Sequence, residues 1–144
     1  MDEKNYVIKQ ISIFSENRPG RLASVAQALG EEKINILAFS IAEANGFGVI
    51  RALVDHPEKA YEKLSGLGFN VAFTEVIAVQ MKDKPGGLYE IAKVLGDANI
   101  NIEYSYAYSG KSAAVLILRV DHVEDAINKI LKSGATLLER SVFH

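Results

Sequence analysis

The chain has 144 residues, of which 49% are hydrophobic and 24% charged, and its formal net charge is −2 at pH 7. This composition is typical of a folded protein with one ordinary domain or two very small ones, and it argues against nucleic-acid binding through a basic surface. The absence of cysteine excludes a disulfide framework, a thiol nucleophile and a cysteine–zinc site. The apolar runs are too short to span a bilayer and the polar N-terminus does not resemble a secretory signal, so we expect a cytoplasmic protein without membrane contact.

An internal repeat organises the sequence. Residues 7–78 align with residues 73–144 at a constant offset of 66, and 19 of the 72 aligned pairs are identical. The identical pairs include turn residues as well as regularly spaced apolar residues, which indicates a duplication. We therefore expect two units, residues 1–74 and residues 75–144.

The first unit reads as alternating strands and helices. Leu22, Val25, Ala26 and Leu29 have the spacing of one helical face after a Pro-Gly turn. An Asn-Gly pair predicts a hairpin, and Asp55 is expected to cap a second helix that ends near Gly68. The predicted strands are residues 6–14, 34–44, 47–55 and 69–74.

The second unit repeats this order. We predict strands at 75–82, 100–108, 113–120 and 136–142, and helices at 87–97 and 123–133. The order βαββαβ predicts an α+β fold of two ferredoxin-like sandwiches, each an antiparallel sheet with its helices on one face. Such a sheet leaves one face and its edges uncovered, which favours a homo-oligomer, most simply a dimer.

Two features of the strands stay open at this stage. Residues 69–81 contain no turn signal, so the sequence does not divide this stretch between the units. In the third strand, Leu37, Phe39 and Ile41 form one apolar face, whereas the tyrosine stripe of the second unit (Tyr104, Tyr106 and Tyr108) occupies the opposite face. The sequence does not say which face the helices cover.

The turn that precedes the first helix carries the most specific chemistry. Asn17-Arg18-Pro19-Gly20 is echoed by Asp83-Lys84-Pro85-Gly86. A helix N-terminus at a cleft attracts a carboxylate or phosphate, and an asparagine offers a carbonyl to an ammonium and an amide to a carboxylate. An α-amino acid needs both kinds of partner. The alternative interpretation is a tight turn in which Asn17 only caps the helix.

Asn-Arg-Pro-Gly-x-Leu, followed by Ile-Asn-Ile fourteen residues after Gly20, on tandem βαββαβ units, resembles the ACT domain family of regulatory modules in amino-acid metabolism. The resemblance implies ligand binding between paired ACT units, with the loop of one unit facing the other. By similarity to the serine-binding ACT domain of phosphoglycerate dehydrogenases, and from the surrounding loop, the expected ligand-binding residues are Ser15, Asn17, Arg18, Pro19, Gly20, Asn35, Met81, Asp83, Pro85, Gly86 and Asn101.

Several of these positions depart from the pattern of the serine binder. Ser15 and Met81 stand where that domain usually has histidine, so serine specificity is not implied. Asp83 replaces asparagine and would repel a ligand carboxylate by about 1 kcal/mol, unless it holds the ligand ammonium instead. We therefore expect unequal sites, with the stronger one at Asn17. Asn35 and its counterpart have an alternative role, closing the turn from helix to strand.

The resulting hypothesis is a non-catalytic sensor that binds a small amino acid. One alternative is a regulatory subunit that docks on a separate biosynthetic enzyme such as acetolactate synthase, and another is an interaction protein without a ligand. We expect no catalytic residues, cofactor, metal site or nucleic-acid partner. His56 and His122 occur once in each unit, which favours helix-start residues over metal ligands.

Overall fold

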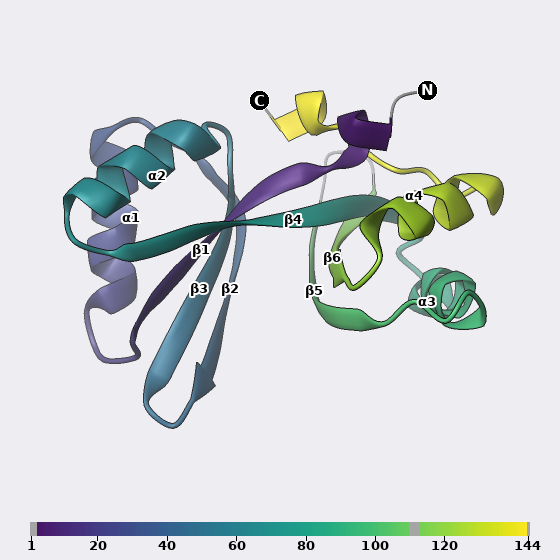
Figure 1. Cartoon of the computed structure of the whole chain (residues 1–144), viewed down its shortest axis with the longest axis horizontal. Helices are drawn as coiled ribbons and strands as arrows, with labels where there is room; N and C mark the ends of the chain where they lie inside the picture. The colour runs from purple at the N-terminus through teal and green to yellow at the C-terminus, as the bar shows by residue number, and fades with distance from the viewer. Residues whose placement is uncertain (1–2, 110–112, 144) are drawn as a thin grey trace. The chain divides into compact units, whose positions relative to one another are not determined.

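The computed structural model describes residues 3–109 and 113–143. The chain divides into two compact units, which we call the first unit (residues 9–74 with Phe143) and the second unit (residues 3–8 with 75–142). One strand, β4 (Asn70–Met81), continues from the first unit into the second without a break (Figure 1). The stretch that the sequence left undivided is therefore a single strand.

The first unit has the expected ferredoxin-like topology. Its strand order is β2-β3-β1-β4, with antiparallel pairing of β3 to both β1 and β2. Helices α1 and α2 pack together beside this sheet (Figure 1). Its other elements are β1 (Ile8–Glu16), α1 (Arg21–Glu31), β2 (Ile36–Ala44), β3 (Phe47–Val54) and α2 (Pro57–Gly66).

The core of the first unit lies between the sheet and the two helices. Ile13 of β1, Leu29 of α1 and Leu64 of α2 are all fully buried in one cluster. The predicted helical stripe is correct for Val25 and Leu29 but wrong for Leu22 and Ala26, which are exposed; Ala28 is buried instead. The buried face of α1 is thus rotated relative to the predicted stripe, and the first turn of the helix lies outside the core.

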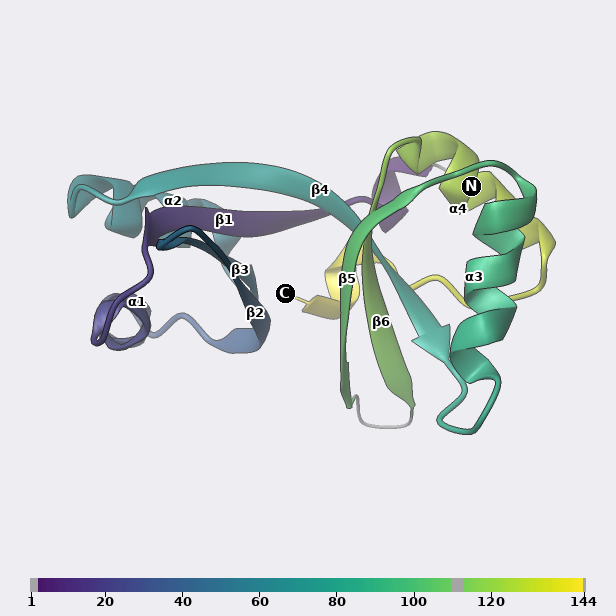
Figure 2. The same ribbon diagram turned by 90° about the horizontal axis from the view of Figure 1, so that it is seen from below.

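The second unit has the strand order β4-β6-β5, again antiparallel, and the pair α3 and α4 packs on one face of these strands (Figure 2). Its core mirrors that of the first unit, with Leu95 of α3 in the position of Leu29. The elements are the 3-10 helix η1 (Glu3–Tyr6), α3 (Gly87–Asp97), β5 (Ile102–Ser109), β6 (Ala114–Val120) and α4 (Val123–Lys132), followed by the 3-10 helix η2 (Arg140–Phe143).

The predicted strand at 136–142 is wrong. The described chain beyond α4 forms only an isolated bridge between Leu137 and Val79 of β4, and then turns into η2. The N-terminal segment provides the reason: Tyr6 is buried in the core of this unit, and Arg140 donates a hydrogen bond to the carbonyl of Lys4. The end of the chain therefore bends toward η1 instead of extending along β4. The strand predicted at 6–14 also begins later, at Ile8.

Register places the tyrosine stripe on the face of the second unit that the helices leave uncovered. Tyr106 lies opposite Ile117 on β6, while the neighbouring Leu116 and Leu118 point into the core under the helices. Alternation along β5 then puts all three tyrosines away from the helices, where they are half-buried. Burial raises the pKa of the Tyr108 phenol above its ordinary value.

In the first unit, the apolar side chains of Phe39 and Ile41 on β2 lie on the face of the sheet that the helices cover. Phe39 pairs with Ala52 and Ile41 with Ile50, and both partners belong to the core under α1 and α2. The bulge beside Leu37 breaks the simple alternation at the start of β2. Phe39 and Ile41 nevertheless remain exposed, at 50% and 43%.

Within the described chain, no helix combines the length and apolar character needed to cross a membrane.

Candidate ligand-binding site

The turn before α1 has the backbone that the Pro-Gly pair predicts. Gly20 has φ +91° and occupies the N-cap of α1, and Gly86 has the same φ at the N-cap of α3. This left-handed conformation favours glycine and lets the chain turn sharply from strand to helix. Neither helix receives a side-chain cap, so the interpretation of Asn17 as a helix cap is wrong.

A pocket of about 300 Å³ lies where this turn meets the first turn of α1 and the β2–β3 hairpin. Its volume is at the lower end of the range for small-molecule sites, about 300–1,000 Å³. The pocket contains all five residues predicted from the loop of the first unit. Its lining residues are Ser15, Glu16, Asn17, Arg18, Pro19, Gly20, Arg21, Leu22, Ala23, Ile41, Gly48 and Ile50.

Backbone contacts hold Asn17 at the mouth of this pocket. The Asn17 N–H donates to the carbonyl of Gly46 over 2.9 Å, which ties the loop to the β2–β3 hairpin. The Asn17 Cβ packs directly against Gly48. The side-chain amide of Asn17 makes no hydrogen bond within the described part of the chain, so its oxygen and its NH₂ group are available to a ligand.

The electrostatics of the pocket favour an anion. Helix α1 has no acidic residue in its first turn, so its positive N-terminal end is not neutralised there. Arg18 is exposed and pairs with Glu16 at 3.5 Å. Arg21, at the first position of α1, has a buried Nε atom without a hydrogen-bond partner among the described residues. One guanidinium group of the pocket is therefore paired at the surface, and the other retains an unused donor.

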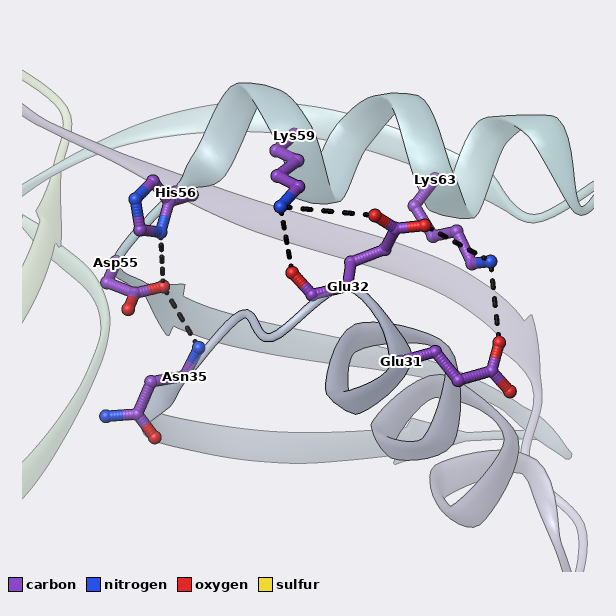
Figure 3. Close-up of polar contacts among 7 residues, drawn as sticks. All are labelled: Glu31, Glu32, Asn35, Asp55, His56, Lys59 and Lys63. Carbon is purple, nitrogen blue, oxygen red and sulfur yellow. Dashed lines mark hydrogen bonds and ion pairs between the residues drawn. The ribbon is translucent and has the colours of Figure 1, made fainter.

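Asn35 lies at the opposite end of α1 from Asn17. The 11 residues of this helix span about 16 Å, so the first unit by itself does not bring the two asparagines together. The Asn35 N–H donates to Asp55 Oδ1 over 3.0 Å (Figure 3). The Asn35 carbonyl in turn accepts a hydrogen bond from the Asp55 N–H. The backbone of Asn35 thus closes the helix-to-strand turn, as the alternative interpretation held. Its exposed side chain points away from Asp55 and makes no hydrogen bond among the described residues.

Asp55 was expected to be the N-cap of α2, and this expectation is wrong. The N-cap is His56, and the Asp55 carboxylate instead contacts His56 Nδ1 at 2.9 Å as well as Asn35. Desolvation by burial is the largest influence on the pKa of Asp55 and raises it, but the hydrogen bonds from His56 and Asn35 outweigh it and lower the pKa. In the described residues, no three acidic or histidine side chains converge as a metal site would require.

The same end of α1 is fastened to α2 by ion pairs. Lys63 lies 3.5 Å from both Glu31 and Glu32, and Lys59 donates to the Glu32 carbonyl over 2.9 Å (Figure 3). These side chains are exposed or half-buried at the surface, where an ion pair contributes little on its own. The Asn35 end of α1 is thus held by charged contacts, whereas the Asn17 end opens on the pocket.

The loop of the second unit differs from that of the first. Gly87, which aligns with Arg21, packs so closely on the Lys82 carbonyl that a Cβ atom there would collide with the oxygen. Met81 and Asp83 line another pocket, of about 740 Å³, beside residues 133–136. Pro85 and Gly86 are not among the residues that line that pocket.

Asn101 repeats the arrangement of Asn35. Its N–H donates to Asp121 Oδ1 over 3.0 Å, and its carbonyl accepts from the Asp121 N–H. It is remote from Met81 and Asp83, because α3 separates them as α1 separates the asparagines of the first unit. The structure therefore groups Ser15 to Gly20 in one pocket, Met81 with Asp83 in another, and neither Asn35 nor Asn101 with them.

Seven lining residues were not predicted as ligand-binding residues: Glu16, Arg21, Leu22, Ala23, Ile41, Gly48 and Ile50. Arg21 and Gly48 carried a signal, because they depart from the repeat. Arg21 aligns with Gly87, and Gly48 aligns with Ala114. The isoleucines look like ordinary strand residues, and their place in the pocket depends on the pairing of β2 with β3.

Comparison with known proteins gives a consistent picture. A family model for an ACT domain pair matches residues 6–141. A protein of known structure from Bacteroides thetaiotaomicron is 34% identical, with a TM-score of 0.89 over 94% of this chain and 94% of that chain. No curated protein matches the sequence.

More distant structures share the fold. The regulatory subunit of aspartate kinase from Thermus thermophilus, in its ligand-free form, is 17% identical, with a TM-score of 0.65 over 90% of this chain and 95% of that chain. The corresponding subunit from Thermus flavus is 16% identical, with a TM-score of 0.61 over 90% and 97%.

Proposed function

Because the chain belongs to the ACT domain pair family, we propose that it is a non-catalytic regulatory protein that binds a small amino acid in the pocket at the start of α1. The observation that carries this proposal is the unengaged side-chain amide of Asn17 beside the open N-terminus of the helix. That pairing supplies what a zwitterion requires: donors for its carboxylate, and an oxygen for its ammonium.

The ligand is expected to be shared between ACT units. Asn17 to Gly20 are all exposed around the pocket, so the first unit by itself leaves the ligand partly open to solvent. Asn35 also has an unengaged amide but lies about 16 Å away along α1. A second ACT unit that presents its own Asn35 equivalent would both cover the pocket and bring the two asparagines onto one ligand.

Sharing the ligand would turn binding into a signal. A ligand with contacts on two units favours the assembled state over the separate one, by as much as its affinity differs between the two states. A homodimer that tightens when the amino acid is present is therefore the expected output of the protein.

Thermal unfolding with each of the twenty amino acids tests the proposal. A ligand at 100 times its dissociation constant adds about 2.7 kcal/mol to the free energy of unfolding, which raises the melting temperature measurably. Asn17→Ala is expected to abolish the shift. Asn128→Ala, which changes an exposed asparagine of α4, is the matched control and should keep it. The proposal fails if no amino acid at millimolar concentration stabilises the wild-type protein.

A further inference from the structure

The walls of the first-unit pocket divide into a polar side and an apolar side. Asn17 and Arg21 belong to the polar side, at the loop and the start of α1. Ile41 and Ile50, paired across β2 and β3, form the apolar side together with Leu22. Ile41 is 43% exposed and Leu22 is 37% exposed, so this apolar surface is accessible to a ligand. A mainly apolar wall with a few convergent polar groups is typical of a site that selects by side chain.

Arg21 is the polar group whose role the fold itself does not explain. Its Nε atom is buried and has no hydrogen-bond partner within the described residues, although buried polar atoms are normally paired. Arg21 also makes no ion pair there, whereas its neighbour Arg18 pairs with Glu16. A guanidinium group binds a carboxylate through two parallel hydrogen bonds, and Nε is one of the donors that such a pair uses.

On the basis of the proposed function, we propose that the pocket selects α-amino acids with an apolar side chain, and that Arg21 binds their carboxylate. The side chain then lies over Ile41 and Ile50, and the ammonium faces the oxygen of Asn17. A serine-like ligand would leave the apolar wall in water. An acidic ligand would place its second carboxylate against that wall, without a partner.

The repeat predicts that this site occurs once per chain. The second unit has Gly87 in place of Arg21, and the Lys82 carbonyl occupies the space that a side chain would need. Its larger pocket is lined by Met81, Asp83 and residues from 133 to 136, and contains no equivalent arginine. The first unit therefore has a carboxylate-binding group that the second unit lacks.

Calorimetric titration of the full chain tests both parts of the inference. The probes are L-leucine, L-valine and L-phenylalanine against L-serine, L-aspartate and L-lysine, with L-leucinamide as the analogue that lacks the carboxylate. We expect an apolar amino acid to bind at one site per chain, at least tenfold more tightly than the polar set. Leucinamide should bind at least tenfold more weakly than leucine.

Three variants separate the contributions. Arg21→Gln should weaken leucine at least tenfold and leave leucinamide unchanged, because only the carboxylate contact is lost. Ile41→Ser, an exposed position, should reduce the preference for leucine over serine. Lys93→Gln removes one exposed cation of α3 and should bind leucine as the wild type does. Melting temperatures without ligand verify that each variant is folded.

The outcomes distinguish this inference from the function it rests on. Binding of serine, aspartate or lysine that requires Asn17 would leave the proposed function standing and overturn the apolar selectivity. Leucine binding that is unchanged in Arg21→Gln would overturn the role of Arg21. Failure of every amino acid to bind would overturn both proposals.

Discussion

A Cβ atom added to Gly48 on β3 would lie 3.1 Å from the Cβ of Asn17. The position of the Asn17 loop therefore depends on the absence of a side chain at position 48. Gly48 is not in the left-handed region, and its backbone therefore accepts alanine without strain. The contact between an alanine Cβ at position 48 and the Cβ of Asn17 would nevertheless be closer than ordinary van der Waals packing, so the Asn17 loop would have to shift.

The first prediction concerns this contact. Gly48→Ala should displace the Asn17 loop by a few tenths of an ångström and weaken amino-acid binding several-fold, with a loss of stability below about 1 kcal/mol. Titration calorimetry measures the first effect and chemical denaturation the second. Gly30→Ala, in the same unit but with open space around its Cα, is the control. Unchanged affinity in Gly48→Ala would show that the loop position does not matter for binding.

A second prediction concerns the loop before α3. Gly87→Ala should destabilise the protein by about 1–3 kcal/mol, because the new Cβ would collide with the backbone oxygen of Lys82. Gly96→Ala, within the same helix and in open space, should instead stabilise by about 0.5–1 kcal/mol. Denaturant midpoints of the two variants should therefore move in opposite directions. Equal shifts would contradict the tight packing of this loop.

A third prediction follows from the lowered pKa of Asp55. The ordinary pKa of an aspartate is about 3.9, and the folded value lies below it. The Asp55 carboxylate therefore stabilises the fold at pH values above about 4, and this contribution is lost as the pH falls through the lowered pKa. Asp55→Asn should flatten the fall in stability as the pH drops below about 4, measured by denaturation at each pH.

Two comparisons identify the source of that pH dependence. His56→Gln removes the imidazole at 2.9 Å and should flatten the same region of the profile. Asp121→Asn, which changes the aligned carboxylate of the second unit, whose histidine lies at 3.9 Å, is the matched control. An unchanged profile in Asp55→Asn would rule out Asp55 as the group responsible.

A fourth prediction uses the repeat within the core. Leu29 and Leu95 are aligned, and both are fully buried between a sheet and a helix pair. Substituting either with alanine should cost about 2–5 kcal/mol, through lost burial and the cavity left behind. Denaturation of the two single variants should give similar losses. A loss below 1 kcal/mol for either leucine would mean that its unit does not depend on this packing.

The fold was largely predictable because the repeat doubles every local signal. The apolar spacing before Leu29 recurs before Leu95, and the Pro-Gly turn recurs with the same left-handed glycine. The strand at 136–142 was not predictable, because its failure depends on Tyr6 and Lys4, which are more than 130 positions away in the sequence. Local alternation carries no information about a contact of that range.

The candidate site was predictable in its loop and not in its wall. Ser15 to Gly20 line one pocket because they are consecutive, and local turn chemistry identifies them. Ile41 and Ile50 join them only through the register of β2 against β3, which a hairpin signal alone does not fix. Asn35 was grouped with Asn17 by similarity, although α1 holds them at its two ends.

The uninterrupted course of β4 makes the two halves of the duplication dependent on one another. The side chains of its 12 residues point alternately to the two faces of the sheet along the whole strand. One residue added at position 74 would therefore move every later side chain of the strand to the opposite face. Ile77 and Val79 would turn away from the core under α3 and α4, and Ala78, which is buried on the other face of β4, would turn toward it. Loop insertions are commonly tolerated where tandem copies meet, but a single residue inserted into this continuous strand would reverse the side-chain pattern of the second copy.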